Sequence, residues 1–269
     1  MPVGVRTVTR GEMKLEIWYP ARENTDGETA SVDFAEFLSD EFFDRLGAGI
    51  TIDQVPTDAV RDAEVRRGES PWPVLVFSHG FAGNRLQSTD ITVHLASRGY
   101  VVVAPEHWGR HTSDILPCLF DPPLEGCDLA GFGDDDPAPD QIGDALDWLG
   151  RAVEDPDDPL FEAVDLDRMG LFGHSAGGAT TAALGDVDDR FDALMPMAGS
   201  GVVSRDVPTM NLVATCDGVV TEDGIRQSHD ASTDARWVGV LGGGHHAFSD
   251  ICLLGLADLA RENLAGREM

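Results

Sequence analysis

The feature that most constrains the fold is the glycine-rich stretch at 170–178, which reads GLFGHSAGG. It places Ser175 between Gly173 and Gly177, after a short apolar run and before a segment with helical spacing. A turn this tight strains the backbone of its central residue and leaves no room for side chains beside it. The pattern GxSxG between a strand and a helix is typical of a nucleophile elbow, with the serine hydroxyl at the start of the helix. The sequence therefore predicts that Ser175 is a nucleophile, with His174 packed beside the turn.

The segments around this turn predict a sheet of mostly parallel strands. Short apolar runs at 74–77 and 100–104 resemble strands buried on both faces, and helical spacing follows at 88–98 and 139–149. This alternation predicts an α/β fold, the α/β-hydrolase fold, with helices on both faces of the sheet. The other expected elements are strands at 14–19 (antiparallel), 60–65, 168–172, 193–197, 209–215 and 236–241, and helices at 31–48, 176–184 and 251–264.

We expect one domain over residues 1–269, a length that allows a single large core. Residues 31–70 and 108–139 are expected to be insertions or cap-like loops, and the second is rich in Pro, Gly and Asp. Its aromatic residues either line a pocket or anchor the loop, and anchoring is the interpretation we favour for each of Trp108, Phe120 and Phe132.

A serine hydroxyl needs a base at neutral pH, and the histidine expected for this fold follows the last strand. Residues 242–250 read GGGHHAFSD, so His245 and His246 are both candidates. His245 is the better candidate because it leaves the glycine loop first and can turn inward. Two adjacent histidines could instead hold a metal, but their side chains diverge and no third ligand is evident, so we expect no metal and no other cofactor.

The acid that orients the base is expected in the turn after the strand at 209–215, where Asp217 lies. Three later aspartates, Asp223, Asp230 and Asp234, are less well placed and are interpreted as solvated surface charge.

An oxyanion hole needs two backbone N–H groups aimed at the carbonyl oxygen that becomes negative. One is expected at Ala176, directly after the serine, and the other at Phe81, in the loop SHGFAG after the strand at 74–77. Gly80 would let the backbone approach, and His79 is expected to hold this loop by hydrogen bonds rather than to act as a second base.

These segments together resemble the platelet-activating factor acetylhydrolases and their bacterial relatives. The similarity runs with gaps from about residue 12 to 253 and is carried by EIWYPA at 16–21, FSHGFAGNRLQSTDITVHLASRGYVVVAPEHWGR at 77–110, GHSAGGAT at 173–180, CDG at 216–218 and GGGHHAFSD at 242–250. The resemblance implies a calcium-independent serine esterase for short or truncated acyl esters, with Ser175, Asp217 and His245 as its catalytic triad. The segments 31–70 and 108–139 depart from the family and are expected to wall the acyl pocket.

Other functions remain open. Polyester hydrolases and cutinases share the elbow and the base loop, so aromatic polyesters are a second substrate class, whereas dienelactone hydrolases carry cysteine where this chain has Ser175. A non-catalytic binding protein on the same fold is the alternative from another class, since a fold does not determine a function. An amidase or peptidase with the same residues is a third alternative.

The charge excludes two classes of partner. The 48 acidic and 19 basic residues give a net charge of −29, which repels nucleic acid and anionic membranes. No run approaches the roughly eighteen apolar residues of a membrane span. We therefore expect a small-molecule or polymeric ester as the partner, without nucleic acid or integral membrane association, and the sequence does not indicate an oligomeric state. The amino terminus lacks the apolar core of a secretory signal, which predicts a cytoplasmic protein unless a signal has been removed.

The four cysteines are too few and too scattered for a disulfide scaffold, and none forms a CxxC pair for zinc. Cys118 could bridge to Cys127, and Cys216 to Cys252. Buried free thiols are an equally good interpretation.

The type of charge predicts adaptation to salt. Lys14 is the only lysine, and Asp outnumbers Glu about two to one. Repulsion within such a surface is screened when the Debye length falls to about 3 Å near 1 M salt. We expect the melting temperature to rise between low salt and molar KCl. An unchanged melting temperature would leave codon bias in a GC-rich genome as the explanation of the composition.

Overall fold

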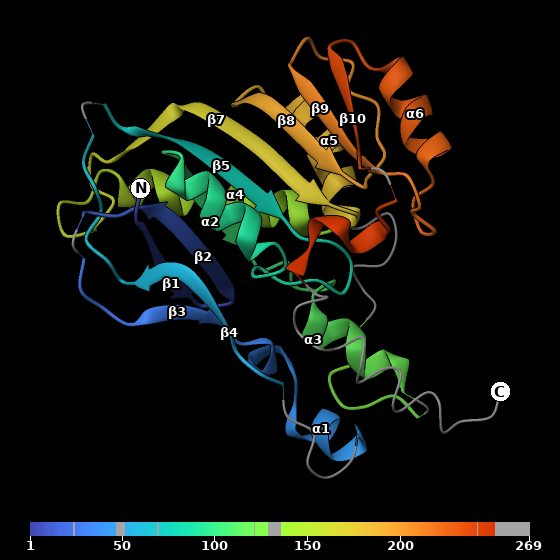
Figure 1. Ribbon diagram of the computed structural model, residues 1–269, viewed down its shortest axis with the longest axis horizontal. Coiled ribbons are helices and arrows are strands. Elements are labelled where there is room, and N and C mark those ends of the chain that lie inside the picture. Colours follow the sequence, from blue (N-terminus) through green and yellow to red (C-terminus); the bar gives the residue numbers. More distant parts are fainter. Residues whose placement is uncertain are drawn as a thin grey trace.

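One twisted sheet forms the centre of the protein (Figure 1). The computed structural model describes residues 1–23, 25–46, 52–68, 70–120, 122–128, 136–240 and 242–250. Among these residues the sheet has ten strands, in the order β10-β9-β8-β7-β5-β6-β2-β1-β4-β3. The part from β10 to β6 is parallel, as the sequence predicts for an α/β-hydrolase fold. Its strands are β5 (Trp72–Ser78), β6 (Val101–Pro105), β7 (Val164–His174), β8 (Phe191–Met197), β9 (Thr209–Ala214) and β10 (Ala235–Val240).

The amino-terminal strands extend this sheet beyond β6. Here β2 (Met13–Pro20) is antiparallel to both β6 and β1 (Val3–Arg10). The sheet then continues through β4 (Val55–Arg61), which is parallel to β1, to β3 (Thr29–Val32), which is antiparallel to β4. The prediction of an antiparallel strand at 14–19 is confirmed, whereas β1 was not predicted.

Two hydrophobic cores lie on opposite faces of the sheet. Because side chains alternate along a strand, Leu171 and Phe172 of β7 belong to different cores. On one face, α4 (Ala138–Ala152) and α5 (Ala176–Val187) pack against β5 and its neighbours, and on the other α2 (Thr89–Ser97) packs against β2 and β6 (Figure 1). The layered α/β architecture predicted from the sequence is therefore confirmed.

The segment predicted as a helix at 31–48 is divided into three elements. It begins in β3, continues as the 3-10 turn η1 (Phe34–Phe37) and ends as α1 (Asp40–Leu46). The Asp33 side chain accepts the Ala35 N–H at 3.0 Å and so begins η1, while β3 pairs with β4. Apolar residues three apart also suit a strand end followed by a 3-10 turn, which is why helical spacing misled the prediction.

Two further predictions need correction. The strand expected at 60–65 is β4, which ends at Arg61 because Asp62 has a positive φ of 52°. The short helix α6 (Glu222–Ala231) was not predicted, because Ile225 is its only buried residue and its pattern is polar. The helix expected at 251–264 lies outside the described residues.

The loop at 108–139 contains α3 (Thr112–Ile115), the 3-10 turn η2 (Leu116–Leu119) and a disulfide. Cys118 and Cys127 form that bridge, with their Cα atoms 4.8 Å apart, so of the alternatives the bridged state is the one found. Cys216 is a free, exposed thiol, and Cys252 lies outside the described residues.

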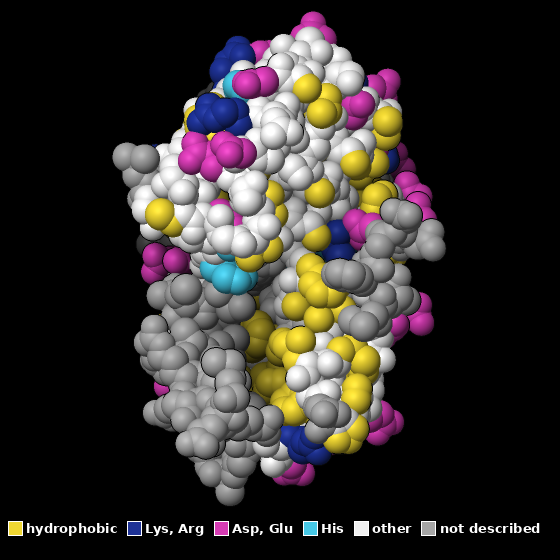
Figure 2. Space-filling view, turned by 90° about the vertical axis from the view of Figure 1, so that its right-hand side faces the viewer, with side chains coloured by type: hydrophobic (Ala, Val, Ile, Leu, Met, Phe, Trp, Pro, Cys, Tyr) yellow, Lys and Arg dark blue, Asp and Glu magenta, His cyan; other side chains and the backbone are white. Residues whose placement is uncertain are grey.

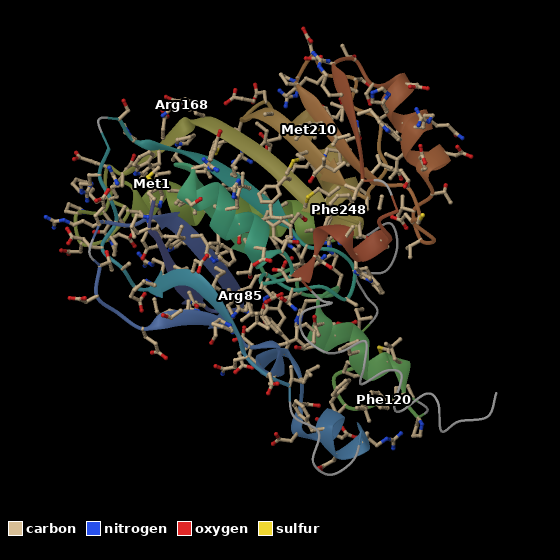
Figure 3. All side chains as sticks on the ribbon, in the orientation of Figure 1. Met1, Arg85, Phe120, Arg168, Met210 and Phe248 are labelled. Atoms are coloured by element: carbon tan, nitrogen blue, oxygen red, sulfur yellow. A yellow bond between two sulfur atoms is a disulfide. The ribbon has the colours of Figure 1, made fainter. Side chains whose placement is uncertain are left out.

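Both described aromatic residues of this loop make holding contacts, but Trp108 is 40% exposed, so it does not anchor the loop in the core. Trp108 donates its indole N–H to the Glu12 carbonyl, and the Phe120 ring packs edge-on against Phe42 with centroids 5.4 Å apart. Figure 3 shows Phe120 far from Phe248, at the end of the molecule that carries α1. Phe132 lies outside the described residues.

None of the helices that the structure describes combines the length and the apolar composition needed to cross a membrane.

Candidate active site

A strained turn holds Ser175 between β7 and α5. Its φ of 57° and ψ of −118° are unusual for a residue with a side chain, and such strain persists only where the surroundings impose it. The surroundings are backbone atoms. A Cβ on Gly177 would lie 1.9 Å from the Ser78 carbonyl oxygen, and one on Gly173 would lie 2.4 Å from the Gly177 oxygen. Both positions therefore require glycine, and the hydroxyl stands at the carboxyl end of the parallel strands.

The structure brings three of the sequence-predicted side chains into one hydrogen-bonded row. His245, the first residue of the 3-10 turn η3 (His245–Phe248), has its Nε2 2.9 Å from the Ser175 Oγ. Its Nδ1 lies 2.7 Å from Oδ2 of Asp217, in the turn after β9. A carboxylate accepts, so Nδ1 carries the proton and Nε2 is left to accept from the serine hydroxyl. The alternative base, His246, is exposed and contacts Ser249 instead.

The environment keeps Asp217 ionised. Burial alone would raise its pKa, but hydrogen bonds from His245 and from the Val219 and Val220 N–H groups outweigh this and hold the pKa below its usual value. Asp223 and Asp230 are exposed on α6, and Asp234 pairs with Arg236, so these acids are remote from the row.

His174 joins this row to the loop after β5. It is buried, and its Nε2–H donates to the His245 carbonyl at 2.8 Å, which leaves Nδ1 as an acceptor for the Gln87 amide. The Gln87 Oε1 in turn accepts the Gly80 N–H at 2.9 Å. Burial is the main cause that lowers the pKa of His174 to about 4, so the ring is neutral at pH 7. Sequence reasoning placed His174 beside the turn and missed Gln87.

The predicted oxyanion donors flank Ser175. Ala176 is the first residue of α5, so its N–H has no partner within the helix. Phe81 lines the same cavity as Ser175. A Cβ on Gly80 would lie 3.1 Å from the Ser175 Cβ, which shows how closely this loop approaches the serine.

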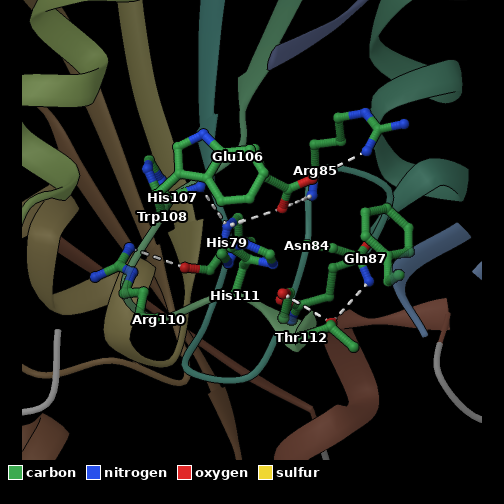
Figure 4. Close-up of polar contacts among 12 residues, drawn as sticks. His79, Asn84, Arg85, Gln87, Glu106, His107, Trp108, Arg110, His111 and Thr112 are labelled. Atoms are coloured by element: carbon green, nitrogen blue, oxygen red, sulfur yellow. Dashed lines mark hydrogen bonds and ion pairs between the residues drawn. The ribbon is translucent and has the colours of Figure 1, made fainter. Parts of the chain in front are cut away.

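Arg85, which follows the loop after β5, forms a buried ionic cluster with three carboxylates (Figure 4). Arg85 is 3% exposed and donates to Glu106 at 2.9 Å, to Glu16 at 3.2 Å and to Glu36. Burial raises the pKa of Glu106 to about 7, against the opposing attraction of Arg85. The cluster was not predicted, since its members come from distant segments.

A cavity of about 340 Å³ opens beside Ser175 and His245. Figure 2 shows a histidine above a furrow that is lined on its described side by hydrophobic side chains. The apolar side chains of the cavity are Val32, Phe34, Phe81, Ala82, Leu86, Leu116 and Val219. Val32 and Phe34 come from the segment 31–70, and Leu116 comes from 108–139, so both insertions supply part of the wall.

A larger hollow of about 740 Å³ lies elsewhere, over β5, β7 and β8, and neither Ser175 nor His245 lines it. We assign the candidate site to the smaller cavity because Ser175 and His245 meet an apolar pocket there. Within the described ranges, no three His, Cys, Asp or Glu side chains are grouped closely enough to hold a metal ion.

Buried neutral histidines make stability depend on pH. Burial lowers the pKa of His111 to about 4, whereas the unfolded chain binds this proton at about 6.5. As the pH falls through this window the unfolded state binds the proton first, so the free energy of unfolding decreases by up to ~3 kcal/mol from this group. His79, His107 and His174 have pKa values lowered for the same reason and add to the effect.

His111→Asn should reduce this loss of stability. His111 caps α3 by accepting the Ser113 N–H at 3.1 Å, a contact that asparagine can also make. Urea unfolding at pH 7, 6, 5 and 4 measures the difference. If the free energy of unfolding depends on pH with the same slope in both proteins, His111 has the same pKa in the folded and unfolded states.

Comparisons with known proteins find relatives in sequence and in fold. Residues 7–121 match a family described as platelet-activating factor acetylhydrolase, isoform II. Among curated relatives, the platelet-activating factor acetylhydrolase of Bos taurus is 25% identical over 231 residues, 71% of this chain and 52% of the relative. That of Cavia porcellus is 24% identical over 267 residues, 87% of this chain and 59% of the relative. The chain thus spans little more than half the length of these relatives.

A solved structure shares the fold. A ferulic acid esterase from Streptomyces cinnamoneus superposes with a TM-score of 0.63 at 26% identity, covering 94% of this chain and 78% of that protein. The chain therefore has an α/β-hydrolase fold and is similar in sequence to the platelet-activating factor acetylhydrolases.

Proposed function

We propose that the protein is a serine hydrolase of carboxylic esters with Ser175, His245 and Asp217 as its catalytic triad. The observation that carries this proposal is the continuous row of hydrogen bonds, 2.7 Å from Asp217 to His245 and 2.9 Å from His245 to Ser175, at the wall of an apolar cavity. A nucleophile, a base and an acid that orients the base are what acyl transfer requires. The ester-cleaving names of the relatives and of the structural neighbour support the same reaction class.

The reaction follows from the roles of these atoms. Ser175 Oγ attacks the acyl carbon while His245 Nε2 takes the hydroxyl proton, and Asp217 stabilises the imidazolium. The negative carbonyl oxygen is bound by the N–H groups of Ala176 and Phe81. The bond from the acyl carbon to the alcohol oxygen then breaks, and the alcohol leaves with the proton from His245. Water repeats the sequence on the acyl-enzyme and releases the acid.

The cavity supports short, uncharged acyl groups as substrates. Its volume of about 340 Å³ must hold the acyl group beside Ser175, and its walls are mainly apolar. The net charge of −29 also disfavours anionic substrates. A second candidate is an aromatic acyl group, as in ferulate esters or aromatic polyesters, because the rings of Phe34 and Phe81 both line the cavity.

Ser175→Ala should lower kcat for p-nitrophenyl acetate by about 10⁴-fold or more, because the reaction loses its nucleophile. Asp217→Asn should lower it by about 10⁴-fold while the fold is kept, since the imidazole loses its orientation and its counter-charge. Asp230→Asn, an exposed acid on α6, is the matched control and should retain the wild-type rate. Full activity in Ser175→Ala would contradict Ser175 as the nucleophile, whereas an inactive wild-type protein would favour the binding-protein alternative.

A panel of acyl groups distinguishes the two substrate classes. We expect kcat/KM to be highest for acyl chains of a few carbons and to fall towards the laurate ester, because the lauroyl chain and the p-nitrophenyl group together exceed a cavity of about 340 Å³. Rates for p-nitrophenyl acetate, butyrate, octanoate and laurate, compared with ethyl ferulate, measure the preference. A laurate rate equal to that of acetate would contradict the short-chain assignment, and a higher kcat/KM for ferulate would select the aromatic class.

A further inference from the structure

Two consecutive peptide groups at the start of the loop after β5 accept hydrogen bonds from, or donate them to, the side chains of Arg110, Gln87 and His79. In the first group, between His79 and Gly80, the carbonyl accepts from Arg110 Nη2 at 3.0 Å and the N–H donates to Gln87 at 2.9 Å. In the second, between Gly80 and Phe81, the carbonyl accepts from His79 Nδ1–H at 2.8 Å. The N–H of Gly83 donates to that same carbonyl at 3.0 Å.

The second peptide group carries the N–H of Phe81. In a trans peptide the C=O and N–H bonds point in opposite directions, so fixing the carbonyl also fixes the direction of the N–H. Both donors to the Gly80 carbonyl belong to the loop itself, and Gly80 lies against Ser175. The His79 ring and the Gly83 N–H together therefore hold the direction of the Phe81 N–H next to the serine. A donor on the carbonyl also polarises the peptide and strengthens its N–H as a donor.

The protonation of His79 is determined by its neighbours. Its Nε2 accepts the His107 N–H at 2.9 Å, so the proton must be on Nδ1, where it donates to Gly80. Figure 4 shows His79 within the buried polar network that includes Glu106, His107 and Arg110. The ring is completely buried and does not line the substrate cavity, which excludes it as a second general base.

We propose that His79 is a positioning residue for the oxyanion hole, which acts by holding the Gly80 carbonyl so that the Phe81 N–H points at the reacting oxygen. The proposal rests on the esterase function proposed above. It requires that the His79–Gly80 hydrogen bond stabilise the transition state more than the ground state, because the oxyanion forms only in the transition state.

The test compares His79→Leu with His79→Asn in a wild-type background that is first shown to hydrolyse p-nitrophenyl acetate through Ser175. Asparagine places an amide N–H near the position of Nδ1, whereas leucine removes the donor. Active sites are counted by burst titration, and kcat/KM is expressed per competent site. The inhibition constant of a trifluoromethyl ketone, whose adduct with serine carries an oxyanion, is measured beside it. Val76→Ala, a core change in β5, the strand that precedes His79, controls for lost stability.

We expect His79→Leu to lower kcat/KM per site by ~10- to 100-fold, less than the loss of a whole oxyanion donor. The ketone should bind more weakly by a similar factor, and His79→Asn should recover most of both. Unchanged kcat/KM per site in His79→Leu, or equal losses in the two variants, would overturn the proposal while leaving the esterase function intact. If His79→Leu does not fold, His79→Gln replaces it, since its longer side chain carries the amide past the Nδ1 position. Equal kcat/KM per site for His79→Asn and His79→Gln would likewise overturn the proposal.

Discussion

The close approach of two backbones at Ser175 is the constraint on which the site depends. The Gly177 Cα lies so near the Ser78 carbonyl that no side chain fits between β5 and the start of α5. This contact fixes the end of β5 relative to the turn after β7, and with it the loop that begins at His79. The strain at Ser175, with φ at 57°, is maintained by packing that extends across two neighbouring strands. Ser175, the proposed nucleophile, and the loop that carries Phe81 are therefore positioned by one contact.

A chain of hydrogen bonds between uncharged groups also connects the loop after β5 to His245. It runs from the Gly80 N–H through Gln87 and His174 to the His245 carbonyl; each donor has one acceptor, and the His174 ring has one compatible tautomer. Neutral links suit this position, because an extra charge beside His245 would shift the proton equilibrium of the base itself. The charges of Arg85 and its carboxylate partners are instead gathered behind the loop, where they satisfy one another. Breaking such a buried cluster costs more than forming it gains, so it specifies the loop more than it stabilises the fold.

The sequence predicted those parts of the site that depend on local pattern. The turn at Ser175 requires glycines at fixed neighbouring positions, and Asp217 and His245 each follow an apolar strand, so short stretches were sufficient. Gln87 was missed because its partner His174 is 87 residues away and nothing around Gln87 marks it. The helix expected at 31–48 failed for a related reason: spacing of three suited both a helix and the observed sequence of strand and 3-10 turn, and only pairing with β4 decided between them.

The parts that the sequence predicted and the parts that it did not predict lie in different regions of the structure. The reacting groups are attached to the carboxyl ends of buried parallel strands, where packing on both faces leaves few alternative arrangements. The cavity walls come partly from segments outside that framework, with Val32 and Phe34 on one side and Leu116 on the other. Leu116 packs against the core and begins the turn that carries Cys118, so the disulfide to Cys127 restrains that wall further. The proposed reacting groups thus lie on a rigid sheet with strong local signals, whereas part of the cavity wall comes from the segments 31–70 and 108–139, whose structure depends on contacts that short patterns do not contain.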